Sequence, residues 1–195
     1  MPLTVTSIGP GRLSRRWAHR KEEKVLNQFV NKIRKEMGLS NEVPEFDPDN
    51  GNENAKILFI LEAPGRKATN TGLISLSNPD QTARNFKNQL DEAGIRKQDI
   101  AIWNIVPWYL GNGNNIRAAE AGDVNMGLKY LGDLIQILTK LKYIVLVGAA
   151  ARRAHVYLSY TTDIKILGCH HPSPRVVNNY PEKVAENVAV FKKIK

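Results

Sequence analysis

The residues best suited to chemistry lie at 171–175, a stretch that reads His-Pro-Ser-Pro-Arg. It follows an apolar run over 164–168, which we interpret as a buried strand, and α/β proteins place binding and catalytic groups at strand ends. Its two prolines fix φ and remove backbone N–H donors, so we expect a stiff, irregular segment rather than a helix. Such a backbone suits a side chain that must be held in place, here His171; a purely structural surface loop is the alternative.

A second candidate is Asn104, an amide inside the apolar run 100–106. A buried amide must find hydrogen-bond partners or cost roughly 1 to 3 kcal/mol. It can bond to neighbouring backbone as a core residue, or it can read a base. One carboxamide offers an acceptor and two donors, which match the N3–H and O4 of uracil, whereas cytosine presents the reverse pattern. A mismatch in a dry pocket leaves buried polar groups unpaired, so the second use discriminates strongly.

The elements that would position these residues alternate between apolar strands and amphipathic helices. We predict strands over 57–61, 100–106, 143–147 and 164–168, and helices over 25–37, 83–93, 124–141, 149–158 and 181–194. Gly38 and Gly94 are expected to end two helices, and Asp80 or Thr82 to cap one. Residues 39–54 are predicted to form a loop. Strands that are apolar on both faces argue for a parallel sheet covered by helices on both sides.

The carboxyl ends of parallel strands lie along one edge of a sheet, so residues that follow different strands become neighbours. At this edge we expect Glu62 to supply a carboxylate, Asn104 an amide and His171 an imidazole. Cations follow the first and fourth strands, at Arg66, Lys67 and Arg175.

Length and composition predict one domain. The chain has 195 residues, 42% of them hydrophobic, which predicts one domain over 1–195.

Charge points to a polyanionic partner. Lys and Arg total 28 against 19 Asp and Glu, a net charge of +9, which favours nucleic acid through phosphate neutralisation; a basic protein without such a partner is the alternative. The first residues, 1–21, are predicted to form a basic arm that lies along a phosphate backbone or is a flexible tail.

Other classes are excluded by composition. The single Cys169 allows no internal disulfide and cannot supply a multi-thiolate zinc or iron–sulfur site, so we expect no metal and no cofactor. No apolar run approaches the roughly 18 residues of a membrane span, and the first residues lack the apolar segment of a signal peptide. We therefore expect a soluble, cytoplasmic monomer.

Four segments together resemble the uracil-DNA glycosylase superfamily. They are ILFILEAPG at 57–65, IWNIVPW at 102–108, LVG at 146–148 and HHPSPR at 170–175, in the family's order and at similar separations. The resemblance spans about residues 40–180. The EAPG form is similar to the thermostable, bacterial and archaeal branches, and HPSPR to the single-strand-selective branch.

The resemblance implies a three-layer α/β/α sandwich with a four-stranded parallel sheet in the order 2-1-3-4. It also implies a monofunctional DNA repair enzyme that flips uracil out of single- or double-stranded DNA and hydrolyses its N-glycosidic bond without a metal.

The resemblance also implies roles for individual residues. Asn104 would read the uracil edge, and His171 would hydrogen-bond its O2 as negative charge develops on the departing base. By analogy with one oxyanion-hole donor, that bond is worth roughly 3 to 4 kcal/mol. The backbone at Ala63, Pro64 and Gly65 would face the base. DNA contacts would come from Arg66, Lys67, Ser173 and Arg175. Ser173 would contact the flanking phosphates, and Arg175 stands at the position of the family's wedge residue.

The chain also departs from the family. Ala63 and Gly65 stand where the best-known branch has a water-positioning aspartate and a tyrosine that excludes the thymine methyl. Glu62, the nearest carboxylate, would either orient water or only accept a hydrogen bond beside the site. Leu73 or Ile74 would replace the phenylalanine that stacks on uracil, a weaker platform. The thermostable branch's iron–sulfur cluster needs four cysteines and is excluded.

Several alternatives remain open at this stage. The base could instead be hypoxanthine, xanthine or a 5-substituted uracil, and the chain could be a non-catalytic nucleic-acid or nucleotide binder. His170 competes with His171, and only the motif register favours the second. We expect the remaining histidines, His19 and His155, to be surface or helix residues, and Trp103 and Trp108 to pack in the core.

Overall fold

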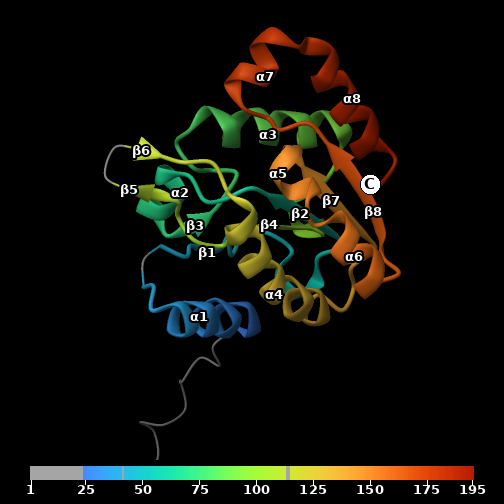
Figure 1. Ribbon diagram of the computed structural model, residues 1–195. Helices are drawn as coiled ribbons and strands as arrows, with labels where there is room; N and C mark the ends of the chain where they lie inside the picture. The colour runs from blue at the N-terminus through green and yellow to red at the C-terminus, as the bar shows by residue number, and fades with distance from the viewer. Residues whose placement is uncertain (1–23, 41, 113–114) are drawn as a thin grey trace, which may run out of the picture.

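The computed structural model describes residues 24–40, 42–112 and 115–195 (Figure 1). The predicted basic arm at 1–21 and His19 lie outside the described residues. The helices are α1 (Val25–Met37), α2 (Arg66–Thr71), α3 (Gln81–Ala93), α4 (Ala121–Ile137), α5 (Gly148–Arg152), α6 (His155–Thr161), α7 (Pro174–Asn179) and α8 (Pro181–Lys192). The strands are β1 (Glu45–Phe46), β2 (Ile57–Leu61), β3 (Leu73–Ile74), β4 (Ile100–Asn104), β5 (Gly111–Asn112), β6 (Asn115–Ile116), β7 (Tyr143–Val147) and β8 (Lys165–Cys169). None of the helices in these ranges is long and apolar enough to cross a membrane.

The central sheet has four parallel strands in the order β4-β2-β7-β8. The register places Ile57 beside both Ile100 and Tyr143, and Tyr143 beside Lys165, so the four strands start and end at nearly the same level. This confirms the predicted order 2-1-3-4, and it brings the residues that follow the strands to a common edge.

Helices cover both faces of this sheet, as Figure 1 shows: α3 and α8 lie on one face, and α1 and α4 on the other. On the first face, the Phe59 ring of β2 makes edge contacts with Phe86 of α3 and Phe191 of α8, at centroid distances of 5.1 and 5.4 Å. On the second face, Trp103 of β4 stacks on Phe46 at 4.6 Å. The three-layer α/β/α sandwich is therefore confirmed.

Trp103 determines which way its neighbours on β4 point. Successive side chains on a strand point to opposite faces. Since Trp103 is 1% exposed and packs toward α1, Ile102 and Asn104 must face α3. The core role predicted for Trp103 and Trp108, which is also buried, is confirmed.

The helix ends follow the predicted local signals. Gly38 and Gly94, with φ of 65° and 75°, end α1 and α3 in the left-handed conformation that glycine adopts without strain. The Asp80 carboxylate accepts a hydrogen bond of 2.9 Å from the backbone N–H of Ala83 and so caps α3.

Four local predictions were wrong in detail, two of them about strands. The segment 39–54 is not all loop, because β1 pairs in parallel with β3 and carries Phe46 to Trp103. The run 164–168 is not a fully buried strand. The strand there, β8, lies at the sheet edge with β7 as its one partner, so Lys165 and Gly168 are exposed.

The other two errors concern helices. The helix predicted over 149–158 is divided into α5 and α6, with Arg153 and Ala154 between them. The irregular segment predicted at 171–175 ends earlier, because α7 starts at Pro174. Proline suits the first position of a helix, where its missing N–H would have no intrahelical partner.

Close packing at Gly127 gives a first prediction about stability. A Cβ at Gly127 of α4 would lie 1.8 Å from the carbonyl oxygen of Ile105, just after β4. We expect Gly127→Ala to lower the free energy of unfolding by about 1 to 3 kcal/mol, the usual cost of overpacking, as measured by urea denaturation.

Gly122→Ala on the same helix is the matched control, because a Cβ at Gly122 meets nothing within 4 Å. Helix propensity should leave this variant as stable as the parent or more stable by up to about 1 kcal/mol. Equal stability of the two variants would contradict the predicted clash.

Candidate active site

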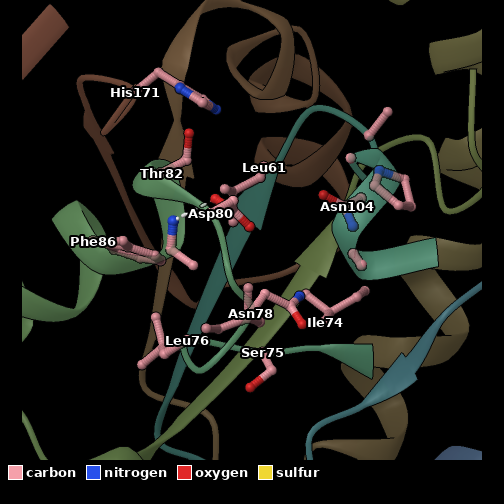
Figure 2. Close-up of a pocket in the computed structure, with 16 residues that line it drawn as sticks. Leu61, Ile74, Ser75, Leu76, Asn78, Asp80, Thr82, Phe86, Asn104 and His171 are labelled. Atoms are coloured by element: carbon pink, nitrogen blue, oxygen red, sulfur yellow. Dashed lines mark hydrogen bonds between the residues drawn. The ribbon is translucent and has the colours of Figure 1, made fainter. Parts of the chain in front are cut away.

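A cavity of about 210 Å³ lies at the carboxyl edge of the sheet. Its walls come from the ends of β2 and β4, the loop at 63–65, the segment 74–83 and the loop after β8. Most of the lining is apolar. Figure 2 shows its polar side chains, which are Ser75, Asn78, Asp80, Thr82, Asn104 and His171.

Asn104 and His171 line this same cavity, although they follow different strands and lie far apart in the sequence. The Asn104 side chain comes from the end of β4 and is 3% exposed. It makes no hydrogen bond to any residue that the structure describes. Buried amides are normally satisfied by protein or ordered water, so this carboxamide is available to whatever enters the cavity.

The His171 ring lies on the side of the cavity opposite Asn104 in Figure 2. Burial lowers the pKa of His171, and the negative charge of Glu62 opposes this to a smaller extent. The ring is therefore neutral near pH 7, with one N–H donor and one acceptor nitrogen. Neither nitrogen is hydrogen-bonded to another residue in the described ranges.

Gly148 lies directly against His171. It follows β7 with a φ of 84°, and a Cβ there would lie 3.1 Å from the Cβ of His171. Only glycine adopts this backbone conformation readily and leaves room for the histidine.

The other candidate histidine of the motif points elsewhere. The His170 Nε2 lies 2.8 Å from Glu186 Oε2, an exposed residue of α8, and His170 is not part of the cavity wall. The structure thus separates two histidines that the sequence left in competition. His155 is exposed on α6, as predicted.

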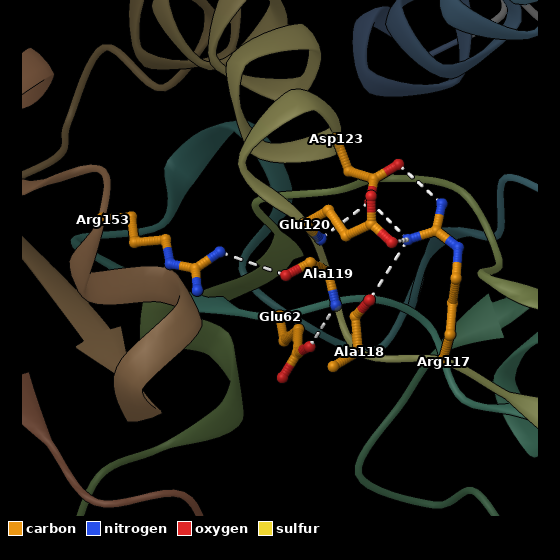
Figure 3. A network of polar contacts seen from close by, with 7 residues as sticks. All are labelled: Glu62, Arg117, Ala118, Ala119, Glu120, Asp123 and Arg153. Carbon is orange, nitrogen blue, oxygen red and sulfur yellow. Dashed lines mark hydrogen bonds and ion pairs between the residues drawn. The ribbon is translucent and has the colours of Figure 1, made fainter.

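Glu62 does not line the cavity, although it directly follows β2. Its Oε1 accepts a hydrogen bond of 2.8 Å from the backbone N–H of Ala119. Arg153 donates to the carbonyl of the same Ala119 at 3.1 Å (Figure 3). The carboxylate therefore fixes the segment that leads into α4, and its role toward water stays a prediction.

The start of α4 is held by a second set of charges next to Glu62. Asp123 accepts from the backbone N–H of Glu120 at 2.8 Å and from both terminal nitrogens of Arg117 (Figure 3). Hydrogen bonds from Arg117 hold the pKa of the buried Asp123 carboxyl below its usual range. Segment 117–123 is therefore held by its side chains, through Arg117 and Asp123, and by its backbone, through Ala119.

The loop residues predicted to face a base do line the cavity, namely Ala63, Pro64 and Gly65. At Gly65 a Cβ would meet nothing within 4 Å, and the φ of −79° suits any residue. In the best-known branch of the family that the sequence resembles, a tyrosine side chain stands at this position. Here the space next to Gly65 is open.

The two residues predicted to form an apolar platform lie in different places. Ile74 lines the cavity, whereas Leu73 does not and pairs instead with Glu45 in the short β1-β3 sheet. The sequence reading missed Phe86, a buried aromatic of α3 that contributes to the same wall.

The residues predicted to contact DNA lie outside the cavity but next to its lining in the chain. Arg66 and Lys67 open α2 directly after Gly65, and Lys67 is exposed. Ser173 and Arg175 lie at the start of α7, two and four positions after His171, and Arg175 is exposed.

Asp80 is the functional candidate that the sequence reading treated only as a helix cap. One carboxylate oxygen accepts from Ala83, and the other has no partner among the described residues. Asn78, by contrast, is built into its loop by bonds to Thr71 and Leu73. The sequence signal that could have indicated Asp80 as a site residue is the polar stretch at 75–82, which lies between the short apolar run at 73–74 and a helix.

Comparison with known proteins shows which family the chain belongs to. The sequence model of the Uracil DNA glycosylase superfamily matches residues 48–195, so the chain belongs to that superfamily. A search of curated proteins finds no match.

Among solved structures, the chain is similar to the NMR structure of a candidate uracil DNA glycosylase from Methanosarcina acetivorans. The TM-score is 0.52 at 16% identity, over 73% of this chain and 92% of the other. At that identity the similarity shows a shared fold.

The buried state of His171 predicts a pH effect on stability. The pKa of His171 in the folded protein lies below the ordinary value of 6.5, so between the two values the unfolded chain binds more protons than the folded protein. The free energy of unfolding should therefore fall as pH falls through that range. Urea denaturation should show a steeper fall for the parent protein than for His171→Ala, while the difference stays constant at higher pH. Parallel curves would contradict the burial of a neutral ring.

Proposed function

We propose that this protein is a DNA glycosylase that flips uracil into the cavity and hydrolyses its N-glycosidic bond. The observation that supports this best is the shared cavity of Asn104 and His171, in which a buried carboxamide has no partner among the described residues and an imidazole faces it from another strand end. Family membership agrees with this choice of chemistry.

Asn104 reads the base in this proposal. Its amide oxygen accepts from the N3–H of uracil and its amide nitrogen donates to O4. Cytosine offers an acceptor at N3 and a donor at its exocyclic amine, so both contacts would be mismatched. Because Asn104 is 3% exposed, water cannot readily compensate, and discrimination is strong.

His171 stabilises the departing base. As the C1′–N bond breaks, its electron pair moves onto the base and negative charge grows on O2. A neutral imidazole N–H that is already in place donates to that oxygen without reorganisation.

A carboxylate can orient and deprotonate the water that completes hydrolysis, and among the described residues Asp80 is the carboxylate that lines the cavity. Its unpartnered oxygen accepts a proton from water while the water oxygen bonds to C1′ and the base leaves with the electron pair of the C1′–N bond. Glu62 is the alternative, acting from beside His171 while it holds Ala119.

The partner in this proposal is DNA. The net charge of +9 favours a phosphate backbone, and exposed Lys67 and Arg175 follow the two loops that line the cavity. Ser173, at the start of α7, would contact a flanking phosphate.

A broader choice of base is favoured by the open space at Gly65. Nothing there blocks a substituent on the pyrimidine ring, so 5-substituted uracils are the second candidate substrates. Hypoxanthine and xanthine belong in the same substrate panel, because the cavity wall carries polar groups beyond Asn104 and His171.

Release of free base tests the proposed function directly. The parent protein should release uracil from single- or double-stranded oligonucleotides. His171→Ala should lower kcat by about 100- to 1000-fold, as the loss of one such donor does. Asn104→Ala should lower kcat/KM for uracil, and the control Asn88→Ala, exposed on α3, should change neither.

The failed outcomes are distinct. Release of hypoxanthine, xanthine or 5-substituted uracil, but not of uracil, would replace the base in the proposal. Saturable, salt-sensitive DNA binding without release of any base would leave a non-catalytic binder.

Matched amide variants separate the two carboxylates. Asp80→Asn keeps a good helix cap and removes the charge, and Glu62→Gln keeps an acceptor for Ala119. We expect Asp80→Asn to lower kcat by about 100-fold or more, and Glu62→Gln by less than about tenfold, in single-turnover assays. If Glu62→Gln instead has the larger effect, Glu62 is the residue that activates the water.

A further inference from the structure

The segment that carries His171 has no regular secondary structure between β8 and α7, yet it must hold the ring in a defined place. Two asparagines from different helices bond to its backbone. Asn187 of α8 holds the residue before His171, and Asn85 of α3 holds the residue after it.

Asn187 holds both backbone groups of His170. Its Oδ1 accepts from the His170 N–H at 2.7 Å, and its Nδ2 donates to the His170 carbonyl at 3.0 Å. The same Nδ2 donates to Gln89 Oε1 of α3 at 2.9 Å. Both side chains are deeply buried, with 2% of Asn187 and 3% of Gln89 exposed.

Asn85 holds the other side of the histidine. Its Nδ2 donates to the carbonyl of Pro172 at 3.0 Å, and its Oδ1 accepts from Gln81 Nε2 at 2.7 Å. Proline has no N–H, so this carbonyl is the one backbone group through which Pro172 can be held by hydrogen bonds.

The polar character of these residues is unusual for their surroundings. The layer between α3, α8 and the sheet is otherwise built from aromatic and aliphatic side chains such as Phe59, Phe86 and Phe191. Apolar residues of similar size could fill the same volume, but they could not bind the loop. A satisfied buried network is costly to assemble and specifies one geometry.

We propose that Asn85 and Asn187 are positioning residues for His171: bonded to the backbone on both of its sides, they fix the direction in which the imidazole enters the cavity. The catalytic consequence rests on the proposed function. The structural consequence does not, because the orientation and burial of the ring can be measured without a substrate.

The test uses Asn85→Leu and Asn187→Leu, with Asn88→Leu as the matched control at an exposed position of α3. Asn85→Ser is a milder variant whose smaller side chain leaves room for a water. The first readout is an NMR pH titration of the His171 ring, assigned by comparison with His171→Ala. When the bonds to the loop are lost, we expect the ring to gain solvent and its pKa to rise toward the ordinary value of 6.5.

The second readout is uracil release under saturating substrate. A ring displaced by about 1 Å should lower kcat by about 10- to 100-fold, with a change in KM below about threefold. Asn88→Leu should match the parent in both readouts. If a leucine variant does not fold, Asn85→Ser decides, with a smaller change in the same direction.

Three results would overturn or separate the claims. A His171 titration that matches the parent in every folded variant would overturn the positioning role. A raised pKa with unchanged kcat would show that the asparagines hold the ring and would overturn the catalytic consequence. A parent protein that releases no base would instead refute the proposed function, while the titration would still decide whether Asn85 and Asn187 hold the ring.

Discussion

The rest of the site depends on one buried amide and the strand that delivers it. Trp103 packs into the core on the α1 face, and strand geometry then turns Asn104 to the opposite face, at the carboxyl end of β4. There the carboxamide is almost fully buried and makes no hydrogen bond to a described residue. Its donor and acceptor face the cavity, where a matching ligand can bond to both. It is the clearest sign that the cavity is shaped for a hydrogen-bonding guest.

The two carboxylates near the cavity make similar hydrogen bonds but lie in different places. Each accepts one backbone N–H with one oxygen, Glu62 from Ala119 before α4 and Asp80 from Ala83 at the start of α3. Asp80 lines the cavity and Glu62 does not. The free acceptor of Asp80 is therefore the one placed to orient a water molecule inside the cavity.

Rigidity at the site comes from the surroundings of the loop rather than from the loop itself. The segment around His171 packs over Gly148 and is bonded by amides of α3 and α8. The helices that cover one face of the sheet therefore also place the imidazole. Core packing and site geometry are coupled in this layer, because the same two helices carry Phe86 and Phe191.

Much of the fold could be predicted from local patterns. Apolar runs and helical periodicity located the four main strands and most helices, and Gly38, Gly94 and Asp80 acted as helix ends and cap as expected. The parallel sheet and its common carboxyl edge then brought Asn104 and His171 to one cavity. The short β1-β3 pair was missed because two-residue strands carry no periodic signal.

The sequence by itself determined which residue types follow each strand, and hence that an amide and a histidine would meet at one edge. Only the tertiary structure decided which histidine enters the cavity, that Glu62 turns to Ala119, and that Asp80 and Phe86 join the wall. The physical reason is that side-chain direction depends on partners from distant segments, such as Glu186 for His170. Periodicity describes one element at a time and does not contain those contacts.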